Sequence, residues 1–269
     1  MDTDRFDRAI ATIVTRNHEN HGIGTLGEKS VHAVVKCYME PDEDYHETPI
    51  DGYVADIFRD DRVIEIQTGA FEKLRGKLGT FLPNYHVTVV HPIPVNKTLC
   101  WADPDTGEIV ERRKSNKHGT PQMIFSELYA IRPFLTDPNL SIVILMIDME
   151  EIKLLDGYGK DKKKRATKYD RLPLRLIEEI HLDCPDDYRM LIPIELEHFT
   201  SAEFAKATGI YKEEGTTAMQ ILNELGVVER IDRTKKGYIY EVTQLCNISS
   251  IYCSHINRIP PRNQNGGKK

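Results

Sequence analysis

Two short segments of alternating polarity, residues 53–58 and 63–67, constrain this chain most, because only the four residues 59–62 separate them. Alternation with a period of two predicts β-strands, and so short a connection joins two strands only as an antiparallel hairpin. Whether the loop comprises two residues or four, symmetric closure sets Asp56 directly opposite Glu65. The sequence therefore predicts two carboxylates face to face on neighbouring strands.

Such a pair of acids needs compensation, because directly opposed side chains lie about 5 Å apart and like charges there are destabilising. Mg²⁺ prefers carboxylate oxygens, keeps several waters and completes its shell with substrate phosphates. Gln67 is expected on the same face as Glu65, since side chains alternate along a strand. We expect the other face to be apolar, with Tyr53, Ala55, Ile57, Ile64 and Ile66. The alternative is an ordinary half-exposed hairpin with solvated acids.

The surrounding segments predict a defined order of elements. Thr25 and Glu28 form a capping box that opens a helix before the hairpin. A further short strand is expected at 46–50, and a helix at 71–81 precedes a buried strand at 87–90. The predicted order is helix, three strands, helix, strand.

Within that order, Asp56 is followed after eight residues by Glu65-Ile66-Gln67, and this pattern resembles the PD-(D/E)XK nuclease superfamily. The superfamily includes restriction endonucleases, Holliday-junction resolvases and RecB-like nucleases. The resemblance covers roughly the first hundred residues, with the metal-binding core expected over residues 25–94, and implies an α/β (α+β) fold with a restriction-endonuclease-like mixed sheet flanked by helices. It also implies that Asp56 and Glu65 bind Mg²⁺ or Mn²⁺, joined by Glu28 from the preceding helix.

Gln67 stands where the motif has lysine, and glutamine supplies no positive charge. Lys73, or Arg75, on the following helix could supply it instead. The resemblance thus implies a Mg²⁺-dependent deoxyribonuclease with Asp56, Glu65, Gln67 and Lys73 as catalytic residues. The alternative is a catalytically inactive DNA-binding regulator or adaptor that retains the nuclease fold. Asp148 and Glu150, on one face at the end of an apolar strand, are a second acidic candidate.

Residues 199–242 have the pattern of a winged helix-turn-helix: two helices separated by Gly209, then a hairpin with its tip at 232–237. In such modules the second helix enters the major groove and the wing contacts the backbone. The predicted DNA-binding residues are Thr216, Thr217, Gln220, Arg233, Lys235 and Lys236. Docking onto a protein or onto the nuclease core is the alternative, because one fold serves many functions.

The predicted organisation is a nuclease-like domain over 1–165, a winged-helix domain with a preceding linker over 166–259, and a disordered tail over 260–269. A net charge of -6 argues against indiscriminate coating of nucleic acid, so contacts with double-stranded DNA must be local. The N-terminus lacks the features of a secretory signal, and no apolar run is long enough to span a membrane, which predicts a cytoplasmic protein. Cutting both strands of a duplex would favour a homodimer.

Overall fold

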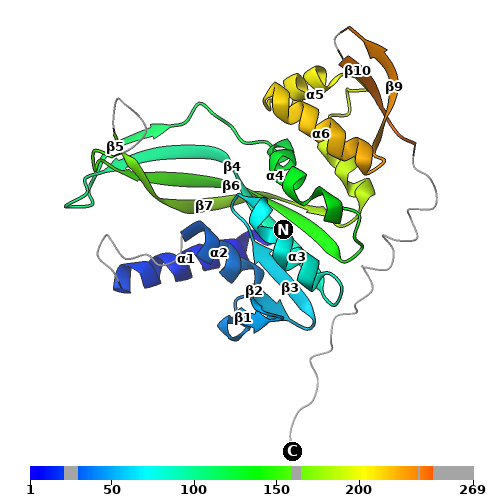
Figure 1. Ribbon diagram of the computed structural model, residues 1–269. Helices are drawn as coiled ribbons and strands as arrows, with labels where there is room; N and C mark the ends of the chain where they lie inside the picture. Colours follow the sequence, from blue (N-terminus) through cyan, green and yellow to red (C-terminus); the bar gives the residue numbers. More distant parts are fainter. Residues whose placement is uncertain (21–29, 159–164, 236, 245–269) are drawn as a thin grey trace, which may run out of the picture.

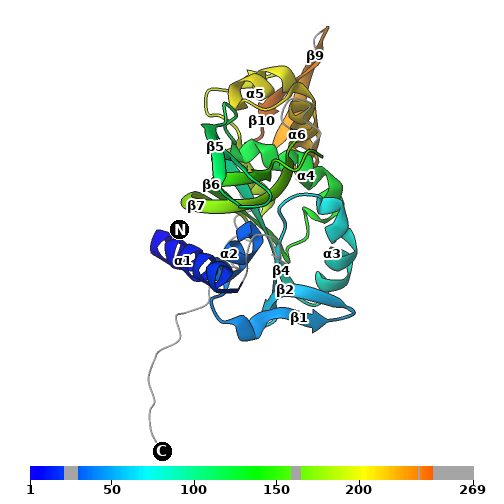
Figure 2. The same cartoon turned by 90° about the vertical axis from the view of Figure 1, so that its left-hand side faces the viewer.

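The computed structural model describes residues 1–20, 30–158, 165–235 and 237–244. It contains a seven-stranded mixed sheet with the order β1-β2-β3-β4-β6-β7, in which β5 pairs with β4 (Figure 1). Helices cover both faces of the sheet (Figure 2). The strands are β1 (His46–Ile50), β2 (Tyr53–Arg59), β3 (Arg62–Ile66), β4 (His86–Ala102), β5 (Ile109–Lys114), β6 (Leu140–Leu154) and β7 (Thr167–Leu182).

The hairpin of β2 and β3 has the predicted register. Arg59 pairs with Arg62, Phe58 with Val63 and Ile57 with Ile64, so the loop holds two residues. Both of them, Asp60 and Asp61, adopt left-handed φ angles of 49° and 58°. This conformation suits a tight hairpin turn, and aspartate tolerates it better than most residues.

The predicted order of helix, three strands, helix and strand is also observed. After α2 (Ser30–Met39) and β1 to β3, the chain passes through η2 (Phe71–Leu74) and α3 (Arg75–Phe81) into β4, which lies parallel to β3. A second crossover through α4 (Ile124–Ile131) leads to β6, parallel to β4. Short 3₁₀ turns complete this region at η1 (Glu43–Tyr45), η3 (Pro121–Met123), η4 (Arg132–Phe134) and η5 (Pro185–Leu191).

The sheet separates two hydrophobic cores. Helices α3 and α4 cover one face, while α1 (Thr3–Asn20) and α2 cover the other (Figure 2). Strand β6 is buried on both sides: Ile142 and Ile144 belong to the first core, whereas Val143 and Leu145 belong to the second. Burial on both faces explains why β6 is the most continuous apolar run of the sequence.

The predicted domain boundary after residue 165 falls inside the main sheet of the structure. Residues we assigned to a linker form β7, which pairs antiparallel with β6 along most of its length. Pro173 and many charged residues hide this strand in the sequence, and the pairing contains three register shifts. A strand that contains proline and charges is tolerated at a sheet edge, where one side needs no partner. The main sheet therefore extends to Leu182.

The C-terminal unit contains the two helices and the hairpin that we predicted. Its elements are β8 (His198–Phe199), α5 (Ser201–Thr208), α6 (Lys212–Glu224), β9 (Val228–Thr234) and β10 (Gly237–Val242), and the strand order is β8-β10-β9. The unit packs onto α4, with the rings of Phe125 and Phe204 6.2 Å apart, and shares one core with it. None of the described helices is long and apolar enough to cross a membrane.

Candidate functional site

Asp56 and Glu65 occupy the point at which the pairing between β2 and β3 ends. The last paired residues are Ile57 and Ile64, and beyond them side chains tie the strands together. Asp56 Oδ2 accepts a hydrogen bond of 2.7 Å from the backbone N–H of Ile66. This bond ties the Asp56 carboxylate to β3, beside Glu65.

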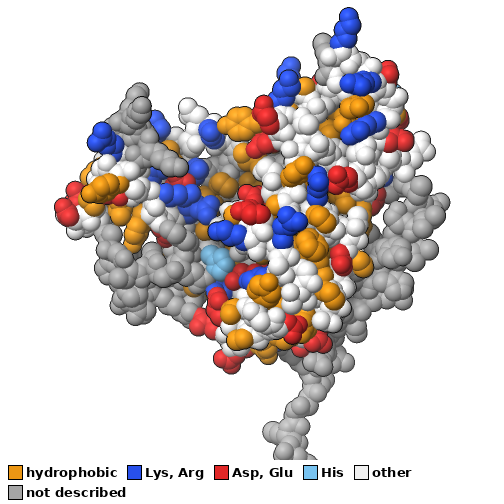
Figure 3. Space-filling view, in the orientation of Figure 1, with side chains coloured by type: hydrophobic (Ala, Val, Ile, Leu, Met, Phe, Trp, Pro, Cys, Tyr) orange, Lys and Arg blue, Asp and Glu red, His pale blue; other side chains and the backbone are white. Residues whose placement is uncertain are grey.

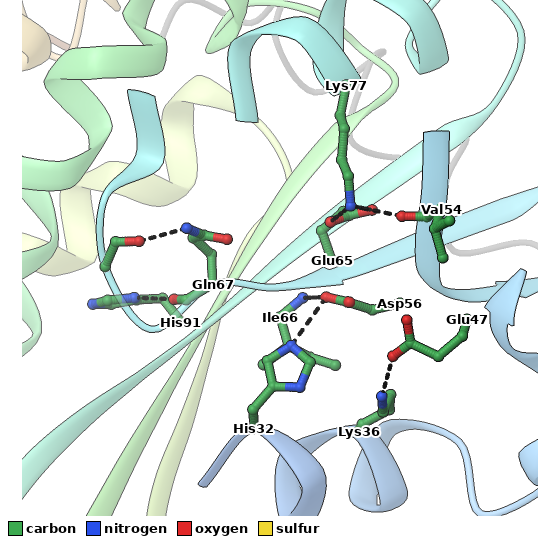
Figure 4. Close-up of polar contacts among 11 residues, drawn as sticks. His32, Lys36, Glu47, Val54, Asp56, Glu65, Ile66, Gln67, Lys77 and His91 are labelled. Atoms are coloured by element: carbon green, nitrogen blue, oxygen red, sulfur yellow. Dashed lines mark hydrogen bonds and ion pairs between the residues drawn. The ribbon is translucent and has the colours of Figure 1, made fainter. Parts of the chain in front are cut away.

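Lys77 of α3 neutralises part of this charge. Its ammonium nitrogen lies 2.9 and 2.7 Å from the two oxygens of Glu65 and donates a 2.7 Å hydrogen bond to the carbonyl of Val54 (Figure 4). Glu65 is only 2% exposed. A buried carboxylate of this kind needs a counter-charge, and the crossover helix supplies it.

The two acids titrate in opposite directions. Burial, together with the nearby charge of Asp56, raises the pKa of Glu65 to about 7 in spite of Lys77. Burial by itself would raise the pKa of Asp56, but the hydrogen bond and the charge of His32 lower it overall. Divergent pKa values in an adjacent pair of carboxyls are a common property of functional sites.

His32 of α2 completes the cluster, with its Nε2 3.3 Å from Asp56 Oδ2. We did not anticipate it, although it follows Glu28 by four residues, a spacing that in the predicted helix sets two side chains on one face. The start of α2 is held by Asp170 of β7, whose carboxylate accepts hydrogen bonds from the backbone and hydroxyl of Ser30. The missed strand therefore helps to position His32.

Gln67 does not point at the acid pair. Its amide nitrogen donates to the carbonyls of Gly69 and Ala70, so the side chain is turned toward the loop that follows β3 (Figure 4). The backbone carbonyl of Gln67 accepts a hydrogen bond from the buried ring of His91. The expected convergence of three polar side chains is thus reduced to the two carboxylates.

Lys73 does not reach the site either. It is exposed in η2 and makes no contact with Asp56 or Glu65 in the described part of the chain. Lys77 contacts Glu65 instead, because it lies between Leu74 and Phe81 on the helical stripe that faces the sheet. Glu28 lies outside the described residues.

The expected apolar face of the hairpin is interrupted at Asp56. Ala55 packs in the α3 core, and the Tyr53 ring lies 5.9 Å from that of Phe81. Ile57 and Ile66 instead pack in the core beneath α2. Ala55 and Ile57, two residues apart on β2, therefore pack in different cores.

The predicted DNA-binding residues are distributed over α6 and the hairpin. Thr216 and Gln220 are exposed, but the hydroxyls of Thr216 and Thr217 donate to carbonyls of their own helix, at 3.3 and 3.2 Å. Arg233 and Lys235 are exposed, and the Arg233 guanidinium lies over the Tyr238 ring. The prediction for Lys236 falls outside the described residues.

Metal ligands are few at this site. Among the residues that the structure describes, no three His, Cys, Asp or Glu side chains are arranged to hold a metal ion. Asp56 and Glu65 provide two carboxylates, with His32 paired to Asp56.

Residues 29–183, more than half of the chain, match the model of a family described as Domain of unknown function (DUF8091). This region includes Asp56, Glu65, His32 and Lys77 and excludes the C-terminal unit. An uncharacterized protein of Treponema pallidum (strain Nichols) is 30% identical over 150 residues, which cover 55% of this chain and 59% of that protein. The match thus spans less than two thirds of the relative's length. No solved structure matches the chain.

Proposed function

This chain belongs to the family described as Domain of unknown function (DUF8091), a description that names no activity, and we propose from the site that it is a metal-dependent endonuclease-like enzyme that hydrolyses phosphodiester bonds in DNA. The observation that carries the proposal is the pair of Asp56 and buried Glu65 on adjacent strands, with Lys77 reaching the pair from the crossover helix. The order α2, β1 to β3, α3, β4 supports the resemblance to PD-(D/E)XK nucleases.

The carboxylates fit a divalent cation. The pKa of Glu65 stays near 7 although Lys77 donates to both of its oxygens, so its negative charge is incompletely compensated. Both contacts of Asp56 use Oδ2, which leaves Oδ1 without a partner among the described residues. Carboxylate oxygens are the ligands that Mg²⁺ and Mn²⁺ prefer. Asp56 and Glu65 would therefore hold the ion.

A cation at this place would stabilise negative charge developing on the scissile phosphate and promote deprotonation of the attacking water. Lys77 supplies the positive charge that Gln67 lacks at the motif's lysine position. Its contacts with Glu65 and Val54 fix the ammonium group beside the acids. A preorganised charge of this kind stabilises a transition state without reorganisation. His32 holds Asp56 in its ionised form.

The C-terminal unit supports a DNA substrate. We infer that α5, α6 and the hairpin of β9 and β10 form a winged helix-turn-helix, with Gln220 on α6 and Arg233 and Lys235 on the hairpin available to a duplex. One acid pair per chain would cut one strand, so cleavage of both strands would need a symmetric dimer.

The experiment is nicking of supercoiled plasmid in Mg²⁺ and in EDTA. Wild-type protein should nick in Mg²⁺ alone, and Asp56→Asn should abolish nicking. Asp148→Asn is the matched control: this acid lies on β6, where it binds Arg175 at 2.8 Å, and its loss should leave nicking intact. Retained nicking by Asp56→Asn would reject the assignment of the site.

Two observations favour the alternative, a catalytically inactive DNA-binding regulator or adaptor. Lys77 already occupies both oxygens of Glu65, and Gln67 is committed to the following loop. A protein of that class would bind DNA equally well in EDTA and in Mg²⁺ and would nick in neither.

A further inference from the structure

A basic groove crosses the half of the main sheet that lies away from the acid pair. It has a volume of about 450 Å³ and is formed by β4, β5, β6 and the loop that follows β5. Among the described residues that line it, Glu151 is acidic and five are basic: Lys97, Arg113, Lys114, Lys117 and Lys153. Figure 3 shows Lys and Arg side chains gathered between β5 and the α5–α6 unit.

Glu151 organises the floor of this groove. It is 6% exposed, and its carboxylate lies 3.3 Å from the ammonium groups of Lys97 and Lys168 and 3.5 Å from that of Lys153. One negative charge thus holds three positive ones. Burial and the charge of Arg171 lower the pKa of Lys168, as expected where cations crowd together. A bound anion would lower the repulsion among these cations.

The walls of the groove are fixed by the fold. The cations of Arg113 and Lys153 lie 5.7 and 5.9 Å from the centre of the buried Trp101 ring. The backbone N–H of Ser115 donates to the carbonyl of Lys97 at 2.7 Å, which holds the loop against β4. Lys117 at the end of this loop donates to the Tyr211 hydroxyl at 3.2 Å. Because Tyr211 caps α6, the groove leads directly to the C-terminal unit.

We propose that this groove binds the phosphate backbone of duplex DNA and holds the duplex between the C-terminal unit and the acid pair. The inference rests on the proposed function for its substrate class. On β4, Val89 pairs with Glu65 and Lys97 lies eight residues further along (97 minus 89). At about 3.3 Å per residue this is roughly 26 Å, or about eight base pairs of B-DNA. One duplex is therefore long enough to reach both places.

The experiment measures binding of a fluorescein-labelled duplex to the full chain by fluorescence anisotropy in EDTA, over a range of NaCl concentrations. The test variant is Arg113→Gln, Lys114→Gln, Lys117→Gln, three exposed groove residues that are not in the acid site. The matched control is Arg8→Gln, Arg62→Gln, Arg132→Gln, three exposed cations outside the groove, the acid pair and the C-terminal unit. The control should bind within twofold of wild type. The groove variant should bind at least tenfold more weakly. Its plot of log affinity against log NaCl concentration should have a slope smaller in magnitude by about 2.7, which is about 0.9 for each of three lost phosphate contacts.

Equal affinity and equal salt dependence of the two variants would reject the proposal that the groove binds DNA. A wild-type protein that does not bind the duplex would reject it as well. EDTA prevents cleavage, so this experiment measures binding alone. The proposed nuclease activity and the proposed DNA-binding groove can therefore be rejected independently. Groove-dependent binding without Mg²⁺-dependent nicking would reject the enzyme and keep the groove. Nicking with unchanged affinity in the groove variant would reject the groove and keep the enzyme.

Discussion

The ammonium nitrogen of Lys77 lies 2.7 Å from Glu65 Oε2 and 2.9 Å from Oε1, and this pair joins the crossover helix α3 to strand β3. The carboxylate is almost fully buried, while the lysine is about a quarter exposed. Removal of one partner from a buried pair is costlier than the pair is worth, because the remaining charge is left uncompensated.

Replacement of Lys77 by Met is therefore expected to lower the free energy of unfolding by about 2 kcal/mol, below the usual cost for a fully buried pair because Lys77 is partly exposed. Urea unfolding at neutral pH measures it. Lys73→Met, an exposed change one turn earlier, should stay within about 0.5 kcal/mol of wild type. Equal stability of the two variants would show that Glu65 does not depend on Lys77.

Asp170 should be as important for stability as a core residue. Its carboxylate accepts from the backbone N–H of Ser30 at 3.1 Å and from the Ser30 hydroxyl, and both residues are buried. Asp170→Ala is expected to cost about 1–3 kcal/mol, since it removes the buried acceptor of two hydrogen bonds at the start of α2. Ser30→Ala should cost less, because the backbone hydrogen bond to Asp170 remains. A larger loss from Ser30→Ala, measured by urea unfolding, would contradict this assignment.

Glu179 predicts how stability depends on pH. His181 and Tyr38 donate to it at 3.0 and 2.6 Å, and these bonds, His181 first, lower the pKa of Glu179 to about 2. The contribution of Glu179 to the free energy of unfolding is thus complete above its ordinary pKa of 4.5 and is lost as the pH falls toward 2. The hydrogen bond to Glu179 raises the pKa of His181 above 6.5. The stabilisation that protonated His181 provides is therefore complete below pH 6.5 and is lost as the pH rises through the raised pKa.

The Glu179 cluster therefore stabilises the fold most between pH 4.5 and 6.5. The urea midpoint of wild type should exceed that of Glu179→Gln, and this difference, measured across pH, should be largest in that window and decline on both sides. A difference that does not change with pH would contradict the assignment.

Gly215 is expected to resist substitution although it lies in a helix. A Cβ there would lie 2.6 Å from the carbonyl oxygen of Ser201 and 2.7 Å from the Cβ of Ala205, so α5 and α6 would have to separate. Gly215→Ala should thus destabilise the protein by at least 1 kcal/mol, within the range of overpacked cores. Gly79→Ala is the control: nothing lies near its Cβ position, and alanine should stabilise α3 by about 0.5–1 kcal/mol. The opposite order of thermal midpoints would contradict this packing.

Local signals in the sequence predicted much of the fold. The register of β2 and β3 followed from the length of their connection, and β6 followed from its apolar run, because each is determined within a few residues. β7 was missed because its stability comes from pairing with β6 rather than from its own pattern, which Pro173 interrupts.

The candidate site was predicted in part for the same reason. Asp56 and Glu65 meet through a short hairpin, whereas Lys77 and His32 reach them from helices whose position depends on packing. Lys73 and Lys77 are both lysines near the start of the same helical segment. Only the stripe of Leu74, Leu78 and Phe81, which turns toward the sheet, distinguishes them.

The most direct measurement is anomalous diffraction from a crystal of this protein soaked in Mn²⁺. We predict a peak within about 2.5 Å of a carboxylate oxygen of both Asp56 and Glu65, with the ammonium group of Lys77 displaced from at least one oxygen of Glu65. A soaked crystal with no peak at this position, and with Lys77 still bound to both oxygens of Glu65, would contradict the claim that the two acids share a cation.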